Sequence, residues 1–300
     1  MLKIIIFVLI ILLVIYFSKY VFYALLHPKT FFTYVYIDIR DYFKYKKYNR
    51  YTNYGVITMY TATGTQVFGS GKTISMIKDV IRIYKQYNNK LVYDPDNKTF
   101  KTQHIHIISN VELNGVPYIK FTGVNQFVDI DKYNFDSMDV AIYVLDESGA
   151  VFNSRQFKNN ISSEMLTRLL QSRKNKCCLF MTSQRLQFTD IILRQICCVV
   201  YECSKKWRFV FLKAYNPLDL EYAYNPEIIK PKSTHLYFCD NNLYNSYNTY
   251  QLVENLNKKY TPLTNEEVLA SYGNYNPSID NLNVTHFKKT YKRRVSGREK

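Results

Sequence analysis

The sequence has little glycine and proline, with 9 and 8 residues among 300, and it contains no internal repeat. These shortages exclude collagen-like, low-complexity and solenoid proteins. Acidic side chains are also few, 24 against 40 Lys and Arg, which leaves a formal net charge of +16. Such a charge favours an anionic partner, either nucleic acid or the inner face of a membrane. An AT-rich coding sequence gives the same excess of Lys, Asn and Tyr, so composition alone does not decide between binding and bias.

No C-x-x-C spacing occurs among the six cysteines, although Cys177-Cys178 and Cys197-Cys198 are adjacent pairs in apolar runs. Successive side chains of a strand point to opposite faces, so neither pair is suited to chelate a metal or form a disulfide. We therefore expect buried, reduced thiols in a reducing compartment. His104 and His106 share one face of a strand-like run, but no further ligand type nearby supports a metal site.

The longest hydrophobic run lies at residues 4–26, with Lys19 as its one charge. Its length matches the roughly 20 residues that cross a bilayer. A cleaved signal peptide is the alternative, but small residues should then follow the apolar core, and Leu25-Leu26-His27-Pro28 follows here. Only Lys3 and the terminal amine precede the run, whereas many Lys and Arg follow it. The positive-inside rule thus predicts a single-pass anchor, residues 1–28, with the rest of the chain cytoplasmic.

Two basic segments flank the remaining sequence. Residues 29–52 are rich in Tyr, Lys and Arg, and either lie on anionic lipids of the inner leaflet or form a solvated linker. Residues 255–300 are polar and end in a basic tail at 288–300, which either binds nucleic-acid phosphates or is a solvated terminus. The region between them, residues 53–254, is predicted to be one α/β domain.

A glycine-rich loop begins this domain. An apolar run at residues 56–60 precedes Gly69-Ser70-Gly71-Lys72-Thr73, and apolar residues at helical spacing follow. Strand, loop and helix in this order are the context that a phosphate-binding loop requires, because backbone N–H groups and the helix N-terminus surround the β-phosphate there. Lys72 is expected to reach the β/γ-phosphates and Thr73 to bind Mg²⁺. The complete pattern has glycine where this chain has Gln66, and an ordinary turn before a helix is the alternative.

An acidic pair, Asp146-Glu147, ends the continuous apolar run at residues 140–145. Such a run is typical of a central parallel strand, and open α/β sheets hold ligands at the carboxyl ends of their strands. We expect Asp146 to bind Mg²⁺ together with Thr73, and Glu147 to accept a proton from the attacking water. A helix N-terminal pair is the alternative.

Two further groups are expected at such a site. A third apolar strand, residues 177–181, precedes Gln184, whose amide either senses the γ-phosphate or caps the strand end. An arginine from a neighbouring subunit commonly completes enzymes of this kind. We count Arg173 with the catalytic residues, although the sequence alone does not distinguish it from the other candidates, Arg155, Arg168 and Arg194.

With these motifs in this order, the chain resembles the zonular occludens toxin family, whose core is similar to the gene I assembly ATPases of filamentous bacteriophages and, more remotely, to the FtsK/HerA translocases. The shared run covers residues 56–253 and includes 106–113, 190–194 and the aromatic segment around 207–211. The resemblance implies an α/β P-loop NTPase fold with a mostly parallel central sheet and flanking helices, preceded here by one N-terminal transmembrane helix. It also implies ATP and Mg²⁺ as cofactors and a homo-oligomeric ring.

The function implied by the resemblance is a membrane-anchored ATPase that drives filamentous phage assembly and exports phage ssDNA through the host cell membrane, with coat or other assembly proteins as partners. Phage ATPases of this type commonly span the membrane after the ATPase domain, whereas the span comes first here. A membrane scaffold with a degenerate nucleotide site is one alternative, motivated by Gln66. A translocase of duplex DNA is another. The toxin activity in the family's name does not follow from these residues.

Overall fold

The computed structural model describes residues 7–8, 11, 16, 18–48, 50–64, 67–94, 97–123, 125–133, 135–151, 163–223 and 228–248. The chain divides into two compact units, Met1–Asn49 with Leu91–Phe100, and Arg50–Lys90 with Lys101–Lys300. The predicted membrane span at residues 4–26 lies partly outside the described residues, and the basic tail at 288–300 lies wholly outside them. Within the described part of the chain, no helix combines the length and the apolar character needed to cross a bilayer.

The first unit contains helices α2 (Ser18–Leu26) and α3 (Pro28–Tyr45) and the 3₁₀ turn η1 (Lys46–Tyr48). Pro28 occupies the first turn of α3, where its missing N–H has no helical partner to lose. Strands β2 (Lys90–Asp94) and β3 (Thr99–Gln103) pair in a two-stranded sheet. Helix α3 has no buried residue, but the ring of Tyr45 at its end stacks on Tyr93 with centroids 3.8 Å apart. Aromatic contacts therefore supply the packing of this helix.

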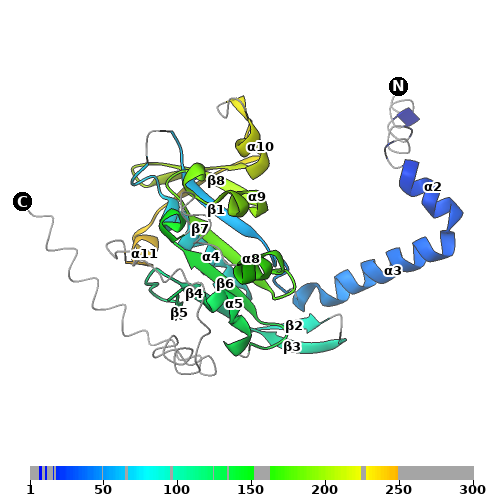
Figure 1. Ribbon diagram of the computed structural model, residues 1–300. Helices are drawn as coiled ribbons and strands as arrows, with labels where there is room; N and C mark the ends of the chain where they lie inside the picture. Colours follow the sequence, from blue (N-terminus) through cyan, green and yellow to red (C-terminus); the bar gives the residue numbers. More distant parts are fainter. Residues whose placement is uncertain are drawn as a thin grey trace, which may run out of the picture. The chain divides into compact units, whose positions relative to one another are not determined.

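The second unit is built on an eight-stranded sheet of order β10-β9-β8-β1-β7-β6-β4-β5 (Figure 1). Six neighbouring strands, from β8 to β5, run parallel, and β9 and β10 extend the β8 edge in antiparallel pairing. The prediction of a mostly parallel central sheet is therefore confirmed. The strand bounds are β1 Ile57–Ala62, β4 Ile105–Ser109, β5 Ile119–Lys120, β6 Val140–Leu145, β7 Cys177–Thr182, β8 Val199–Lys206, β9 Phe209–Tyr215 and β10 Ser233–Phe238.

Helices cover both faces of this sheet (Figure 1). On one face, α4 (Lys72–Tyr87) packs through Ile74, Ile77 and Val80. On the other, α5 (Asn125–Val128), α8 (Ser163–Leu170) and α9 (Ile191–Ile196) contribute apolar side chains. The remaining short elements are η2 Ile130–Tyr133, α6 Ser148–Val151, η4 Leu186–Phe188, α10 Pro217–Tyr222 and α11 Asn241–Tyr244.

Strand β6 shows why the sequence has a continuous apolar run. Val140, Ile142 and Val144 belong to the core cluster on the α4 side, whereas Ala141, Tyr143 and Leu145 belong to the cluster on the opposite side. Successive residues of a strand alternate between faces, so a strand covered on both sides requires apolar residues at every position. Each fully buried Val or Leu contributes about 1.5–3 kcal/mol relative to exposure. This core fixes the end of β6 where the acidic pair follows.

The cysteines are all free, and five of the six are buried. Burial raises the pKa of Cys177 to about 12, which keeps that thiol protonated and unreactive. The expectation of six buried thiols is wrong for Cys198, which is exposed. Cys197 follows the last residue of α9 and is buried, whereas Cys198 lies in the bend before β8, outside the strand.

His106 pairs with a carboxylate, and the described residues contain no cluster of metal ligands. Its Nε2 lies 2.9 Å from Asp139 Oδ2, and both side chains are buried. Asp139 also accepts hydrogen bonds from the N–H groups of His104 and Asp136, at 3.0 and 3.1 Å. Burial acts to raise the pKa of Asp139, but the contacts with His106 and the two N–H groups outweigh it and lower that pKa.

Asp139→Ala is expected to lower the free energy of unfolding by about 3 kcal/mol at pH 7, because it leaves the buried His106 and two partly buried N–H groups without their acceptor. Because the folded-state pKa of Asp139 is depressed, its stabilisation is present above the unfolded pKa of about 4 and is lost as pH falls through the folded pKa. Urea unfolding at pH 7 and in acid measures both effects. The exposed pair of Asp131 with Arg168 provides the control, since Asp131→Ala should cost less than about 1 kcal/mol. Equal losses of unfolding free energy in Asp139→Ala and Asp131→Ala would contradict the stabilising role of Asp139.

Candidate functional site

The phosphate-binding loop leads from β1 into α4 at the carboxyl edge of the sheet. Gly69 and Gly71 have φ of +66° and +90°, which favour glycine. A Cβ at Gly71 would lie 3.2 Å from both Cγ atoms of Val210 on β9, so a larger residue there would have to displace Val210 as well as adopt the left-handed backbone. Lys72 is the first residue of α4, and its Nζ donates a hydrogen bond to the loop carbonyl of Val67 at 2.7 Å. The buried Ser70 completes the loop.

Asp146 is the point where three segments meet. Its Oδ1 accepts hydrogen bonds from Thr73 Oγ1 at 2.8 Å and from Thr182 Oγ1 at 2.6 Å. Thr73 is in the first turn of α4, Asp146 follows β6, and Thr182 ends β7. These strands are adjacent in the order β1-β7-β6. The hydroxyl and the carboxylate predicted to share Mg²⁺ are thus in direct contact.

Asn110 fixes the backbone of Asp146 from the neighbouring strand. Its Oδ1 accepts from the Asp146 N–H at 2.8 Å, and its Nδ2 donates to the Asp146 carbonyl at 3.0 Å. Sequence reasoning assigned no role to Asn110 or to Thr182. A polar residue directly after an apolar strand was the available signal at both positions, but its use requires the order of strands in the sheet.

Glu147 has a left-handed backbone, with φ of +51°. This conformation is uncommon for a residue other than glycine and costs about 1–3 kcal/mol. Thr182 stabilises it, because its Oγ1 accepts the Glu147 N–H at 2.9 Å and its carbonyl accepts from Ser148 Oγ at 2.7 Å. The Glu147 side chain is exposed. Strained residues of this kind cluster at functional sites, where the surrounding contacts hold one orientation.

The electrostatics of the site suit a bound polyphosphate and a divalent cation. Burial lowers the pKa of Lys72, while the Asp146 and Glu147 carboxylates act to raise it. Burial also raises the pKa of Asp146, against the opposing hydrogen bonds from Thr182 and Thr73 and the charge of Lys72. Both charged forms are therefore penalised by desolvation. A polyphosphate beside Lys72 and a cation beside Asp146 would favour the charged forms of both.

Gln184 lies half-buried two residues beyond β7, at the same carboxyl edge of the sheet as the loop. The neighbouring Arg185 donates to the Gly64 carbonyl, at the start of the loop, at 3.4 Å. The edge occupied by Gln184 is thus the one that carries Lys72 and Asp146. Gln66 lies outside the described residues.

The structure describes three of the four candidate arginines, Arg168, Arg173 and Arg194. Arg173 lies in the turn that precedes β7, at the amino ends of the strands, and its backbone adjoins Gly55. The structure therefore does not bring Arg173 together with Lys72 in one chain. Arg168 forms an ion pair with Asp131 at 2.6 Å, and Arg194 with Glu221. Arg155 lies outside the described residues.

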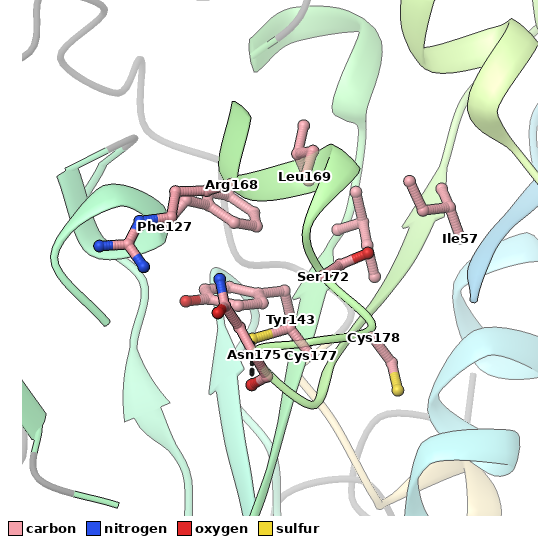
Figure 2. A pocket seen from close by; sticks show the side chains of 10 residues that line it. Ile57, Phe127, Tyr143, Arg168, Leu169, Ser172, Asn175, Cys177 and Cys178 are labelled. Carbon is pink, nitrogen blue, oxygen red and sulfur yellow. Dashed lines mark hydrogen bonds between the residues drawn. The ribbon is translucent and has the colours of Figure 1, made fainter. Parts of the chain in front are cut away.

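A cavity at the amino edge of the sheet is distinct from this site (Figure 2). It is lined mainly by apolar side chains of β1, β6, β7 and α8, among them Ile57, Tyr143 and Leu179. The Arg168 guanidinium extends away from Ser172 and Cys178 in Figure 2, in keeping with its ion pair to Asp131. Because the cavity is at the opposite end of the strands from Lys72, it contributes nothing to phosphate binding.

Thr182→Val is expected to lower the rate of nucleotide hydrolysis by about tenfold to a hundredfold, because it removes the hydroxyl that orients Asp146 and Glu147 while keeping the side-chain shape. The Mg²⁺ concentration for half-maximal activity should rise, whereas nucleotide affinity should change little. Thr189→Val is the matched control, since the Thr189 hydroxyl is buried without a hydrogen-bond partner among the described residues. Wild-type kcat and Mg²⁺ dependence in Thr182→Val would exclude this positioning role.

No protein-family model matches the sequence, and no curated protein matches it. Among solved structures, the chain is similar to the N-terminal domain of zonular occludens toxin from Neisseria meningitidis, with 17% identity over 64% of this chain and 98% of that chain, and a TM-score of 0.42. It is also similar to B204, the DNA-packaging ATPase from Sulfolobus turreted icosahedral virus, with 13% identity over 62% and 93% of the chains and a TM-score of 0.38.

Proposed function

We propose that this chain binds ATP with Mg²⁺ at the carboxyl edge of its central sheet and hydrolyses it. The observation that carries the proposal is the contact of Thr73 Oγ1 with Asp146 Oδ1 at 2.8 Å, directly after the glycine loop and Lys72. A hydroxyl, a carboxylate and an ammonium from distant parts of the sequence are the groups that a magnesium triphosphate requires. The same groups support nucleotide binding better than an ordinary turn before a helix.

Each residue has a defined role in this proposal. The N–H groups of Gly69, Ser70 and Gly71 bind the β-phosphate, and Lys72 binds the β/γ-phosphates. Thr73 and Asp146 would hold Mg²⁺, which would neutralise charge on the phosphates. Glu147 would orient the attacking water and take its proton as the bond from the water oxygen to the γ-phosphorus forms and the bond from that phosphorus to the β,γ-bridging oxygen breaks, which releases ADP.

The remaining roles concern the γ-phosphate. The half-buried Gln184 would bind its oxygens from the end of β7. An arginine from a second subunit of a ring would stabilise the charge that develops on it, and Arg173 is proposed for this role because it lies at the far end of the strands from Lys72 of its own chain.

We further propose that hydrolysis drives export of phage ssDNA during virion assembly at the host membrane. The order of the motifs, which resembles the gene I assembly ATPases, supports this role. The hydrophobic run at residues 4–26 and the basic segment at 29–52 support an anchor on the inner leaflet, with coat or assembly proteins as further partners. A scaffold that binds nucleotide without turnover is the second candidate, favoured by Gln66 in the loop.

The test is to measure nucleotide binding and ATP hydrolysis by the purified full chain, alone and with ssDNA or duplex DNA. Hydrolysis that ssDNA stimulates more than duplex DNA supports the export motor. Greater stimulation by duplex DNA identifies a duplex translocase. Binding without hydrolysis under all conditions identifies the scaffold, and the absence of any nucleotide binding overturns the whole proposal.

A further inference from the structure

The antiparallel end of the sheet carries an exposed aromatic cluster. Trp207, Phe209 and Phe238 have 72%, 40% and 48% of their surface exposed. Their ring centroids lie 5.4–5.9 Å apart, and Phe209 is the direct cross-strand partner of Phe238. Phe211 and its partner Leu236 are also exposed and continue the same face of β9 and β10. Contiguous exposed apolar surface of this kind marks an interaction site.

The position of Trp207 is backbone-strained. It occupies the turn between β8 and β9 with φ of +56°, where asparagine, aspartate or glycine is usual. A bulky residue in this conformation is a rare outlier, and nothing in the local turn requires an aromatic ring. The side chain itself is mostly exposed, so burial does not offset the strain. An aromatic ring kept at such a cost indicates a role for its exposed surface.

Basic side chains border this face. Lys206 and Lys213 are exposed on β8 and β9, and Lys213 stands opposite Thr234 on β10. Arg208 supports the turn, since it donates to the Cys239 carbonyl at 3.0 Å and to Asn241 Oδ1 at 2.8 Å. Exposed aromatic rings next to cations are the composition of surfaces that bind single-stranded nucleic acid, where bases stack and phosphates are neutralised.

The opposite face of the same strands contacts the phosphate-binding loop. Val210 is the residue against which a Cβ on Gly71 would press. The Tyr237 hydroxyl lies 2.7 Å from Ser75 Oγ, which in turn donates to the Gly71 carbonyl at 2.6 Å. The residues that alternate with the aromatic cluster along β9 and β10 therefore support the loop itself. A ligand on the outer face is separated from the nucleotide site by one layer of sheet.

We propose that the aromatic face formed by Trp207, Phe209 and Phe238 binds single-stranded nucleic acid, with bases stacked on the rings and phosphates near Lys206 and Lys213. The charge of the chain favours this occupant, since a net charge of +16 attracts a polyanion. The inference deepens the proposed function and rests on it in one respect. An effect of nucleic-acid binding on ATP hydrolysis would be transmitted to the nucleotide site through Val210 and Tyr237.

Trp207 allows a direct test, because it is the one tryptophan of the sequence. Titration of the full chain with oligo(dT) of about 16 nucleotides, a length that covers the site size of typical single-strand binders, should quench the Trp207 fluorescence. An inorganic polyphosphate of similar charge has no bases to stack and should leave the fluorescence unchanged. Oligo(dT) that binds without quenching, or fails to bind, overturns the proposal. So does equal quenching by polyphosphate or by duplex DNA.

Affinity measured by fluorescence anisotropy of labelled oligo(dT) provides the second arm. Trp207→Ala and Phe238→Ala should each weaken binding by about tenfold, as expected for the loss of one stacking contact. Trp207→Phe keeps a ring and should bind nearly as the wild type does. Tyr222→Ala, which removes an exposed ring on α10, is the matched control and should have no effect. If Phe238→Ala instead dissociates an oligomer and leaves the oligo(dT) affinity unchanged, the face is a subunit interface and the proposal is wrong.

These measurements separate the two proposals. Lys72→Ala should leave the quenching of Trp207 intact, because the binding face needs no nucleotide. Quenching of Trp207 without ATP hydrolysis would support the nucleic-acid face and count against the motor. ATP hydrolysis without quenching would support the ATPase and overturn the nucleic-acid face. When both hold, Tyr237→Phe should reduce the stimulation of hydrolysis by ssDNA severalfold while the oligo(dT) affinity stays unchanged, since it breaks the contact to Ser75.

Discussion

Glu147→Gln is expected to reduce ATP hydrolysis by about 10²–10⁴-fold while nucleotide still binds, since this is the range that a positioned general base contributes. Glutamine has almost the same shape as glutamate, and the Glu147 N–H can still donate to Thr182 Oγ1, so the strained backbone is retained. What is lost is the carboxylate that accepts the proton of the attacking water. Single-turnover hydrolysis, with binding of a fluorescent nucleotide measured in parallel, separates the chemical step from affinity.

Glu112→Gln is the matched control for this prediction. Glu112 is an exposed carboxylate beyond β4, and the same isosteric change there should leave kcat and nucleotide affinity as in the wild type. Trapping of bound ATP by Glu147→Gln, with no turnover, would be consistent with the assignment. Undiminished hydrolysis would show that another group takes the proton and that the left-handed backbone at residue 147 has a different cause.

The sequence was sufficient to locate the centre of the candidate site. The predicted strand at residues 140–145 has the same bounds as β6, because a strand covered on both faces leaves an unbroken apolar run. The loop and the acidic pair could be placed at one edge since carboxyl ends of parallel strands lie together. The contact of Thr73 with Asp146 then follows from the position of the loop before α4 and from the end of β6, and it does not depend on the residues between them.

The residues that support Asp146 could not be found in this way. Thr182 and Asn110 act because β7 and β4 are the two neighbours of β6, and strand order is set by packing of the whole sheet. Arg173 illustrates a different limit, since the role proposed for it in a neighbouring subunit's site would leave no signature in its own chain. The aromatic face could be identified only from the cross-strand register, because Phe209 and Phe238 are far apart in sequence and adjacent only through the β9–β10 pairing.

Lys72→Ala is expected to lower both the affinity for nucleotide and the rate of ATP hydrolysis, whereas Glu147→Gln lowers the rate alone. Lys72 is the ammonium of the loop, and removal of one preorganised donor to developing charge typically costs about 10²–10³-fold in rate. Nucleotide should also bind more weakly, so the increase in Tm that a saturating ligand gives to the wild type should be largely absent. Thermal unfolding with and without Mg-ATP, together with hydrolysis rates, measures both losses.

The pH dependence of nucleotide binding gives the Lys72 assignment a signature that a merely structural lysine would lack. Burial lowers the Lys72 pKa, and a bound polyphosphate raises it again, so protons are taken up on binding when the pH lies near the lowered pKa. Affinity of the wild type should therefore weaken as pH rises through that pKa, and in Lys72→Ala this dependence should vanish. Lys85→Ala, on the exposed last turn of the same helix α4, should keep both the affinity and its pH dependence. A Lys72→Ala variant with wild-type affinity at every pH would mean that the loop binds no phosphate, since no interaction between ammonium and anion would have been lost.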